Sequence, residues 1–198
     1  MRTDLHSEEI LKLEFEYARE TAYQAQNDRT VIVNLYLLLV GGVGSLLLAA
    51  NSLAPLGKLD IPSQALTLLF AVLGLLGVLT LFKLIRLRQA WFDSARAMNV
   101  IKAYYLETFP ELDTALIWKT KTIPSLGKAW TITFILSAMV ILLSSISFAT
   151  AIHFLEIGRG DAQLIVDAIV FGFAVSMQLL FYFFQLRKTD ENTNDGSK

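Results

Sequence analysis

The sequence predicts an all-α integral membrane protein with four transmembrane helices, the first two extended into a cytoplasmic antiparallel helical hairpin. Three observations predict this class. The chain has 198 residues, of which 54% are hydrophobic and only 18% are charged, and its mean hydropathy is +0.51. The apolar residues gather in four blocks, and the basic residues gather on one side of these blocks. Such segregation is typical of a protein that resides in a bilayer.

Each apolar block is long enough to cross a membrane as a helix. A helix needs about 20 residues to cross about 30 Å of hydrocarbon, whereas barrel strands are about half as long and alternate in polarity. We therefore predict transmembrane helices over residues 31–53, 65–85, 130–152 and 162–186.

The basic residues predict the orientation of these helices. All of them except Lys58 and Arg159 lie before the first block, between the second and third, or after the fourth. The positive-inside rule then places both termini in the cytoplasm of a multi-pass plasma-membrane protein, and we expect the bacterial inner membrane. A lipid-facing basic cluster that anchors this topology is expected at the inner surface, formed by Lys83, Arg86 and Arg88.

Two polar segments are predicted to continue the first two spans as helices. Residues 1–30 form an amphipathic helix that starts at Ser7, and residues 86–108 form a coiled-coil-like helix that stops before Pro110. Their apolar residues recur at steps of three and four, so we expect the two helices to pack as a hairpin, although part of the seam could face a neighbouring subunit. The predicted seam comprises Leu11, Phe15, Ala18, Ala22, Leu87, Trp91, Met98, Ile101 and Tyr105.

Two further segments complete the predicted cytoplasmic part. Residues 109–129 are expected to form a short interfacial helix and turn that lead back to the membrane. Residues 187–198 are polar throughout and are expected to form a disordered tail.

Three strongly polar residues lie inside the predicted spans and are candidate functional residues. Asp167 lies near the outer end of the fourth span, within reach of His153, Arg159 or Thr150, and is either a paired acid or part of a pore or proton path. Asn34 and Gln178 either join helices by hydrogen bonds or line an aqueous path.

Small residues at steps of four mark close helix contacts, either within one chain or between chains. These residues are Gly41, Ser45 and Ala49 on the first span, and Ala168, Gly172 and Ser176 on the fourth.

The sequence holds no pattern of catalytic or metal-binding residues. It has no cysteine, and its two histidines, His6 and His153, are predicted on opposite sides of the membrane. No phosphate-binding glycine loop, nucleophile elbow or zinc-protease motif appears. We expect a protein that is not an enzyme and that uses no cofactor or metal. The net charge of −1 gives no reason to expect nucleic acid as a partner.

Two stretches carry a resemblance to known families: YQAQNDRTVIVNLYLLLVGG, and LIRLRQAWFDSARAMNVIKAYYLETFPEL with its run from Met98 through Glu107 to Pro110. Over about residues 10–110 the chain resembles the RipA-type small bacterial membrane proteins, which form octamers. It also resembles the two-span SLATT effectors in the helix that holds Trp91, Arg96 and Lys102. Either resemblance implies a prokaryotic inner-membrane protein that self-assembles, and it transfers no catalytic residue.

The leading hypothesis is a homo-oligomeric membrane protein whose cytoplasmic helices mediate assembly or receive a signal, with spans that could enclose a pore. One alternative is a small transporter or ion channel that uses Asp167 and Gln178. Another is an accessory membrane subunit that docks a soluble cytoplasmic protein. The expected partners are therefore the lipid bilayer, further copies of the chain, and a cytoplasmic protein.

Overall fold

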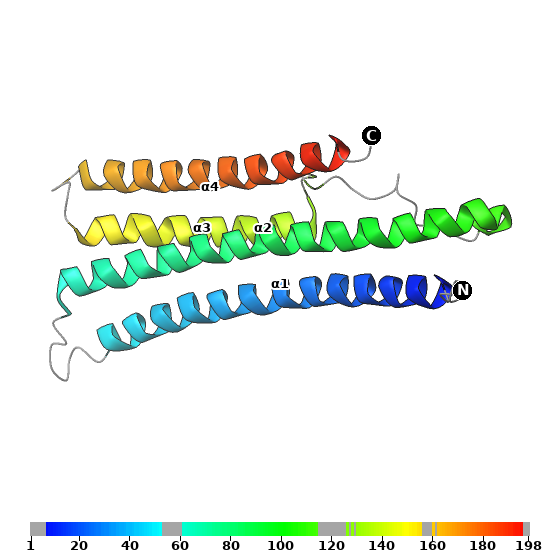
Figure 1. The fold of residues 1–198 in the computed structure, drawn as a ribbon. Coiled ribbons are helices and arrows are strands. Elements are labelled where there is room, and N and C mark those ends of the chain that lie inside the picture. Colours follow the sequence, from blue (N-terminus) through cyan, green and yellow to red (C-terminus); the bar gives the residue numbers. More distant parts are fainter. Residues whose placement is uncertain are drawn as a thin grey trace, which may run out of the picture. The chain divides into compact units, whose positions relative to one another are not determined.

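The structure, a computed structural model, describes residues 7–52, 61–114, 126, 128, 130–155, 160 and 162–195. Over these residues the chain is all-α (Figure 1). The helices are α1 (Ser7–Ser52), α2 (Ser63–Thr108), the short 3-10 helix η2 (Pro110–Thr114), α3 (Ile132–Phe154) and α4 (Ala162–Asp195). Each α-helix contains a stretch long and apolar enough to cross a membrane. The predicted class of an all-α chain with four such helices is confirmed.

Helices α1 and α2 each run without a break through a polar segment and an apolar segment. Both are 46 residues long. Near the start of α1, Glu8 and Glu9 place carboxylates at the positive end of the helix dipole. Helix α2 ends at Thr108 because the residue before Pro110 is biased away from helical backbone angles.

The segment after α2 is described only in part. Helix η2 lies within the predicted interfacial segment 109–129, and its described residues are exposed. Residues 115–125, 127 and 129 lie outside the described residues, so most of the predicted interfacial helix is not tested.

Helix α3 begins at Ile132, and the predicted start at Trp130 is wrong. The backbone of Trp130 has a φ of 63°, a left-handed conformation that cannot continue into a right-handed helix. Thr131 is extended and forms the N-cap, with its hydroxyl accepting a hydrogen bond from the Phe134 amide at 3.2 Å. This cap satisfies one of the free amides at the start of the helix.

Helix α4 extends past the predicted end of the fourth span at Leu186. It continues to Asp195, so the prediction of a disordered tail is wrong as far as that residue. The physical reason is that no glycine or proline follows Gly172 until Gly196, and nothing in between interrupts the helical hydrogen bonds.

The chain divides into two compact units, each built from separate stretches. We call the unit formed by Thr30–Ile85 and Ala129–Gln185 the apolar unit, because it holds the apolar parts of all four helices. We call the unit formed by Met1–Arg29, Arg86–Lys128 and Leu186–Lys198 the polar unit.

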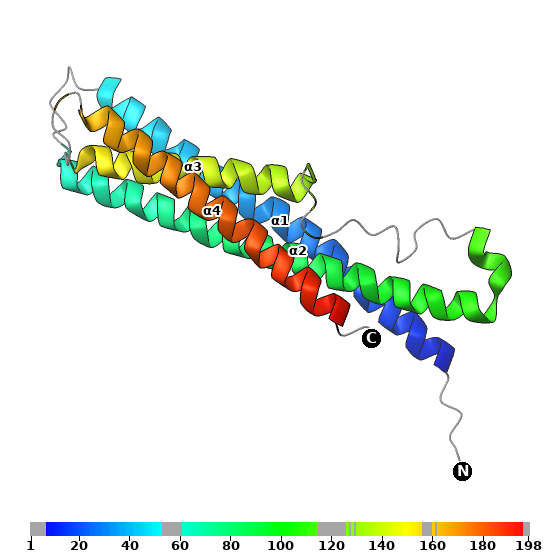
Figure 2. The same cartoon turned by 90° about the horizontal axis from the view of Figure 1, so that it is seen from above.

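Helix α3 is the most covered helix of the apolar unit (Figures 1 and 2). Of its most apolar window, 39% is buried, compared with 11% for α1 and 6% for α4. It contacts α2 through Ser144, whose hydroxyl donates to the Gly74 carbonyl. It contacts α4 through the rings of Phe134 and Tyr182, whose centroids lie 6.0 Å apart. Helix α3 therefore holds much of the core of this unit.

Gly77 of α2 lies where side chains of α1 and α3 come close to the α2 backbone. Tyr36 on α1 is buried, and its hydroxyl donates to the Leu73 carbonyl at 3.4 Å. A β-carbon added at Gly77 would lie 2.5 Å from this hydroxyl oxygen and 2.6 Å from the β-carbon of Ser144. Only glycine therefore fits between the three helices at this position.

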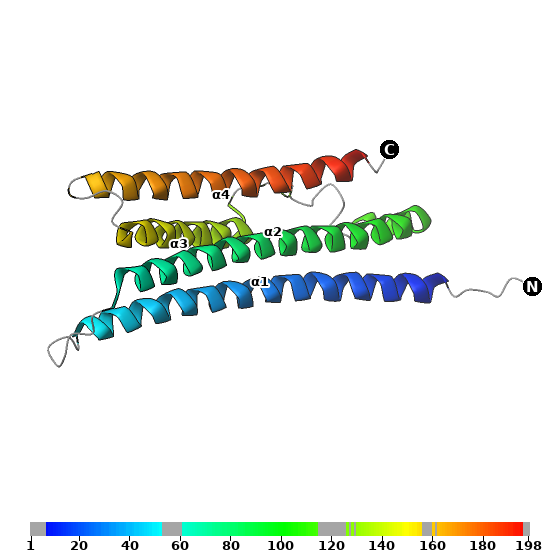
Figure 3. The same ribbon diagram turned by 60° about the vertical axis from the view of Figure 1, so that its left-hand side comes forward.

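In the polar unit, the N-terminal part of α1 lies beside the C-terminal part of α2 (Figure 3, blue and green). The ammonium of Lys102 lies 5.9 Å from the ring centroid of Phe15. On α1, Ala18, Ala22 and Ala25 are buried. The other residues of the predicted seam are half-buried: Leu11, Phe15, Leu87, Trp91, Met98, Ile101 and Tyr105.

We predict that Gly77→Ala destabilises the protein. Alanine favours a helix interior by about 1 kcal/mol over glycine, but overpacking a closed contact costs about 1–3 kcal/mol. The β-carbon of Ser144 is fixed to the α3 backbone and cannot move aside, so we expect a net loss of about 1–2 kcal/mol in the free energy of unfolding. Denaturant unfolding in detergent, followed by circular dichroism, measures this loss.

Gly172→Ala is the matched control. No atom lies within 4 Å of a β-carbon added at Gly172, so only the helix-propensity gain remains. Equal stability changes in the two variants would show that the contact around Gly77 does not exist.

Candidate functional site

The serine side chains of α3 gather on its buried face. Ser137, Ser144, Ser145 and Ser147 are each at most 4% exposed. The Ser144 hydroxyl donates to the Gly74 carbonyl of α2 at 3.0 Å, and the Ser147 hydroxyl donates to the Leu143 carbonyl of its own helix at 2.8 Å. The bond from Ser144 ties α3 to α2.

Gln178 connects α4 to the same face of α3. Its amide nitrogen donates to the Ser145 hydroxyl at 3.1 Å and to the Ala174 carbonyl at 3.2 Å. The bond to Ala174 fixes the orientation of the amide, because the reverse orientation would set two oxygens against each other. Gln178 is 7% exposed, and its side-chain oxygen is buried without a hydrogen-bond donor. The expected interhelical hydrogen bond is thus present in the structure.

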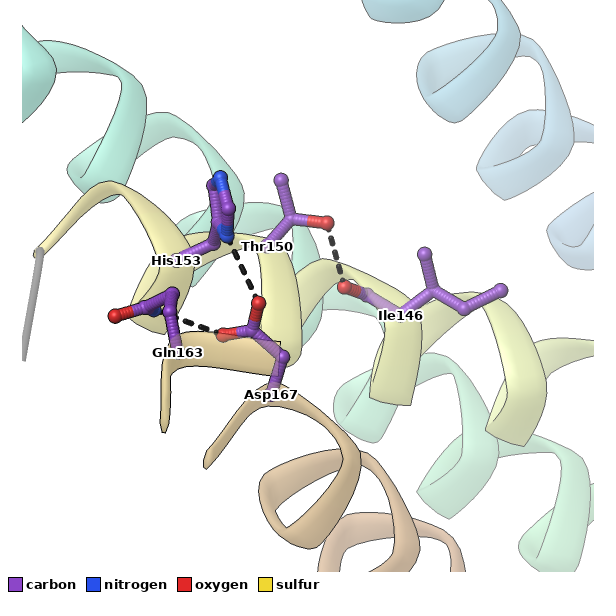
Figure 4. A network of polar contacts seen from close by, with 5 residues as sticks. All are labelled: Ile146, Thr150, His153, Gln163 and Asp167. Atoms are coloured by element: carbon purple, nitrogen blue, oxygen red, sulfur yellow. Dashed lines mark hydrogen bonds and ion pairs between the residues drawn. The ribbon is translucent and has the colours of Figure 1, made fainter. Parts of the chain in front are cut away.

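Asp167 lies at the centre of a polar cluster near the end of α3 and the start of α4 (Figure 4). One carboxylate oxygen lies 2.8 Å from Nδ1 of His153, and the other accepts a hydrogen bond from the Gln163 amide at 3.0 Å. Of the partners that the sequence allowed, the structure selects His153. Arg159 lies outside the described residues, and the Thr150 hydroxyl donates to the Ile146 carbonyl instead.

The contact between His153 and Asp167 connects the end of α3 with the start of α4. The side chain of His153 is 56% exposed and that of Asp167 is 20% exposed. The nearby Thr150 hydroxyl is engaged with its own helix. Among the described residues, no group of three or more metal-ligating His, Asp or Glu side chains occurs.

Asn34 is not brought together with the other polar candidates. Its side chain is exposed on α1, and within the described part of the chain no hydrogen bond to it is found. Its predicted roles, in helix contact or along an aqueous path, stay predictions.

The predicted small-residue stripes are exposed on the surface of the apolar unit. Around Gly41 and Gly172 no atom lies within 4 Å of an added β-carbon. The exposed members of the two stripes are Gly41, Ser45, Ala49, Ala168, Gly172 and Ser176. Among the described residues, Gly41 and Gly172 therefore make no close helix contact, and the second predicted possibility, contact between chains, stays a prediction.

Close contacts inside the chain instead use Gly74 and Gly77 of α2, which the sequence analysis missed. A β-carbon at Gly74 would lie 2.8 Å from the ring of Phe148. The sequence does contain a pattern that indicates these contacts. Gly74 and Gly77 are three residues apart in the second span, and the serines of the third span are small enough to let two helix backbones approach.

The predicted basic cluster is divided in the structure. Lys83 and Arg86 are exposed, but Arg88 is 7% exposed, with its guanidinium carbon 5.0 Å from the ring centroid of Trp91. The expectation that Arg88 faces lipid is therefore wrong. It lies two residues after Arg86, and a turn of about 200° places it on the other side of the helix.

One acidic residue of the polar unit has a perturbed ionisation equilibrium. Partial burial raises the pKa of the Asp93 carboxyl, and the positive charge of Arg96 opposes this rise. Both residues lie on α2.

Comparisons with family models, with curated proteins and with solved structures find no match to this chain. The function must therefore be argued from the helices and their contacts.

We predict a small coupling between His153 and Asp167 in a double-mutant cycle. Exposed ion pairs contribute about 0.2–1 kcal/mol, so the cycle of His153→Ala and Asp167→Ala should give a coupling in that range. Denaturant unfolding of the two single variants and the double variant measures it. The cycle of Thr150→Ala with Asp167→Ala is the control and should give no coupling. A coupling of several kcal/mol would mean that the pair is buried and more than a surface connection.

Proposed function

We propose that this chain is a non-enzymatic protein of the plasma membrane that spans the bilayer four times and assembles with further copies of itself. Its two polar helical segments mediate the assembly or receive a signal in the cytoplasm. A pore between subunits is one form that such an assembly could take.

The surface of the apolar unit supports a location in the bilayer. Large apolar side chains are exposed along all four helices, for example Leu38 at 74%, Leu68 at 66% and Leu164 at 79%. In water, contiguous apolar surface of this kind drives aggregation, whereas in hydrocarbon it needs no cover. The distribution of basic residues supports cytoplasmic termini.

Contacts in the polar unit support a cytoplasmic helical hairpin. Phe15 on α1 meets Lys102 on α2, and a depression of about 460 Å³ between the same segments is lined by Leu11, Ile101 and Tyr105. Lys12, Glu16 and Arg19 also line this depression, so charged residues of both signs surround its apolar floor. An apolar floor with a charged border suits a protein partner or another subunit.

The observation that carries the proposal of self-assembly is the exposure of small residues on α1 and α4. Lipid chains make poorer van der Waals contact with a face of glycine, serine and alanine than another helix does. Gly41 and Gly172 lie on the two least covered apolar helices and have open space beside them. The resemblance to octamer-forming membrane proteins supports the same proposal.

The polar candidates favour this proposal over a transporter or channel within one chain. Asp167 is engaged by His153 and Gln163, and the amide nitrogen of Gln178 is engaged by Ser145. These contacts connect helices. They also engage both carboxylate oxygens of Asp167, so the acid is not free to bind a transported ion.

We predict that cysteines at the two stripes form disulfides between copies of the chain. Because the chain has no cysteine, each introduced thiol is unique. Ser45 and Gly172 lie at similar depths in their predicted spans, so in a ring the α1 face of one copy can meet the α4 face of the next. The variant Ser45→Cys/Gly172→Cys should give a ladder of cross-linked species in oxidised membranes.

Leu46→Cys/Gly172→Cys is the control, because Leu46 is also exposed but lies about 100° further around the helix. It should cross-link far less. The mass of the unmodified protein in mild detergent should exceed that of one chain. A strict monomer in that measurement, together with equal cross-linking of both variants, would contradict self-assembly.

A further inference from the structure

A groove of about 500 Å³ runs along the apolar unit between α2, α3 and α4. On α2 its lining extends from Thr67 to Phe82, and on α4 from Val170 to Phe181. Helix α3 lines it from Phe148 to Leu155. Every lining residue lies within the apolar part of its helix. In the proposed membrane location the groove therefore opens toward lipid.

The wall of the groove is apolar. Thr67 and Gln178 are its two polar residues, and their side-chain oxygens are buried away from its surface. The amide nitrogen of Gln178 is already bonded to Ser145. An occupant therefore meets aromatic rings and aliphatic groups and needs no polar atom of its own along the groove.

The length of the groove is comparable to that of one leaflet of a bilayer. At 1.5 Å per residue, the lining stretches of α2 and α4 are about 22 Å and 16 Å long. The hydrocarbon core of a bilayer is about 30 Å thick, so the acyl chains of one leaflet extend over about 15 Å. An acyl chain that enters the groove from one surface can therefore lie along most of its length.

Two aromatic rings meet at one end of the groove. Phe82 of α2 and Phe181 of α4 both line it, and their ring centroids lie 4.9 Å apart. The other end lies at Thr67 and Leu155, near the ends of α2 and α3 that the proposed topology places at the outer surface. A chain that enters there would run inward until it meets the two rings.

We propose that this groove is a binding site for one acyl chain of an outer-leaflet lipid, with the methyl end of the chain against Phe82 and Phe181. The proposal rests on the membrane location argued above and does not depend on self-assembly. The bound lipid differs from the surrounding lipid because walls from three helices hold it, and van der Waals contact along its length slows its exchange.

The test uses the full chain in vesicles of phosphatidylethanolamine and phosphatidylglycerol. A trace of phosphatidylcholine carries a photoactivatable diazirine either near the methyl end or near the carboxyl end of one acyl chain. After photolysis, the labelled residues are located by peptide mass spectrometry. We expect the methyl-end probe to label the peptides of Phe82 and Phe181, and the carboxyl-end probe to label those of Thr67 and Leu155.

Variants that fill the groove provide the second measurement. Ala71→Phe and Ala174→Phe each place a ring in the groove, whereas Val72→Phe adds a ring at an exposed neighbouring position on α2. Both groove variants should lose the labelling of Phe82 and Phe181 and the lipid that stays with the purified protein. Val72→Phe should keep both. Labelling of the exposed α1 residue Leu38 should persist in all three and shows that they remain folded in the membrane.

Two results would overturn the inference. If the groove residues are labelled no more strongly than Leu38, and equally in the groove variants, the groove holds only ordinary surrounding lipid. Disulfide formation between two copies of Ala71→Cys would mean that a second chain covers the groove. An absence of labelling at every position, Leu38 included, would instead refute the membrane location and, with it, the proposed function.

Discussion

The arrangement of this protein depends on one constraint: a polar group on an apolar helix must find its partner within the protein. Helix α3 meets this constraint for α2 and α4, because two of its buried serine hydroxyls form hydrogen bonds with those helices. Ser144 binds the Gly74 carbonyl of α2, and Ser145 accepts from Gln178 of α4. The approach that these bonds require is possible only because Gly74 and Gly77 present bare backbone on α2. The polar contacts thus determine which faces of the helices pack together. The apolar residues determine only that these segments form helices.

The same arrangement explains why two kinds of surface are left over. Helices α1 and α4 use few residues to contact their neighbours, so most of their apolar surface is exposed. Part of that surface consists of small residues suited to another helix, and the groove beside α4 has apolar walls suited to a hydrocarbon chain. The proposed assembly and the proposed lipid binding therefore use different parts of this surface. The polar unit adds a third surface, with an apolar floor and charged residues of both signs around it, which the proposal assigns to a signal or a partner.

The sequence predicted the four helices because their apolar stretches are long and because no proline interrupts them. The sequence alone could not identify which residue contacts Asp167, because His153, Thr150 and Arg159 are all close enough along the chain to reach it. It also could not separate the glycines that pack within the chain from those that stay exposed, because both sets have similar spacing. The burial of Arg88 depends on which side of α2 meets its neighbours, and composition does not contain that information. Trp130 and the last turns of α4 show that helix ends depend on single backbone conformations and on the absence of a terminating residue.

The central claim is that the chain crosses the bilayer four times with both ends on one side. A membrane-impermeant maleimide tests it on intact cells that express single-cysteine variants. Gly57→Cys, between α1 and α2, and Glu111→Cys, in η2, would be placed on opposite faces. Four crossings predict that the thiol at position 57 reacts from outside and that the thiol at position 111 reacts only after the cells are opened. Equal reaction of both thiols in intact cells would contradict the topology and remove the basis for a cytoplasmic hairpin.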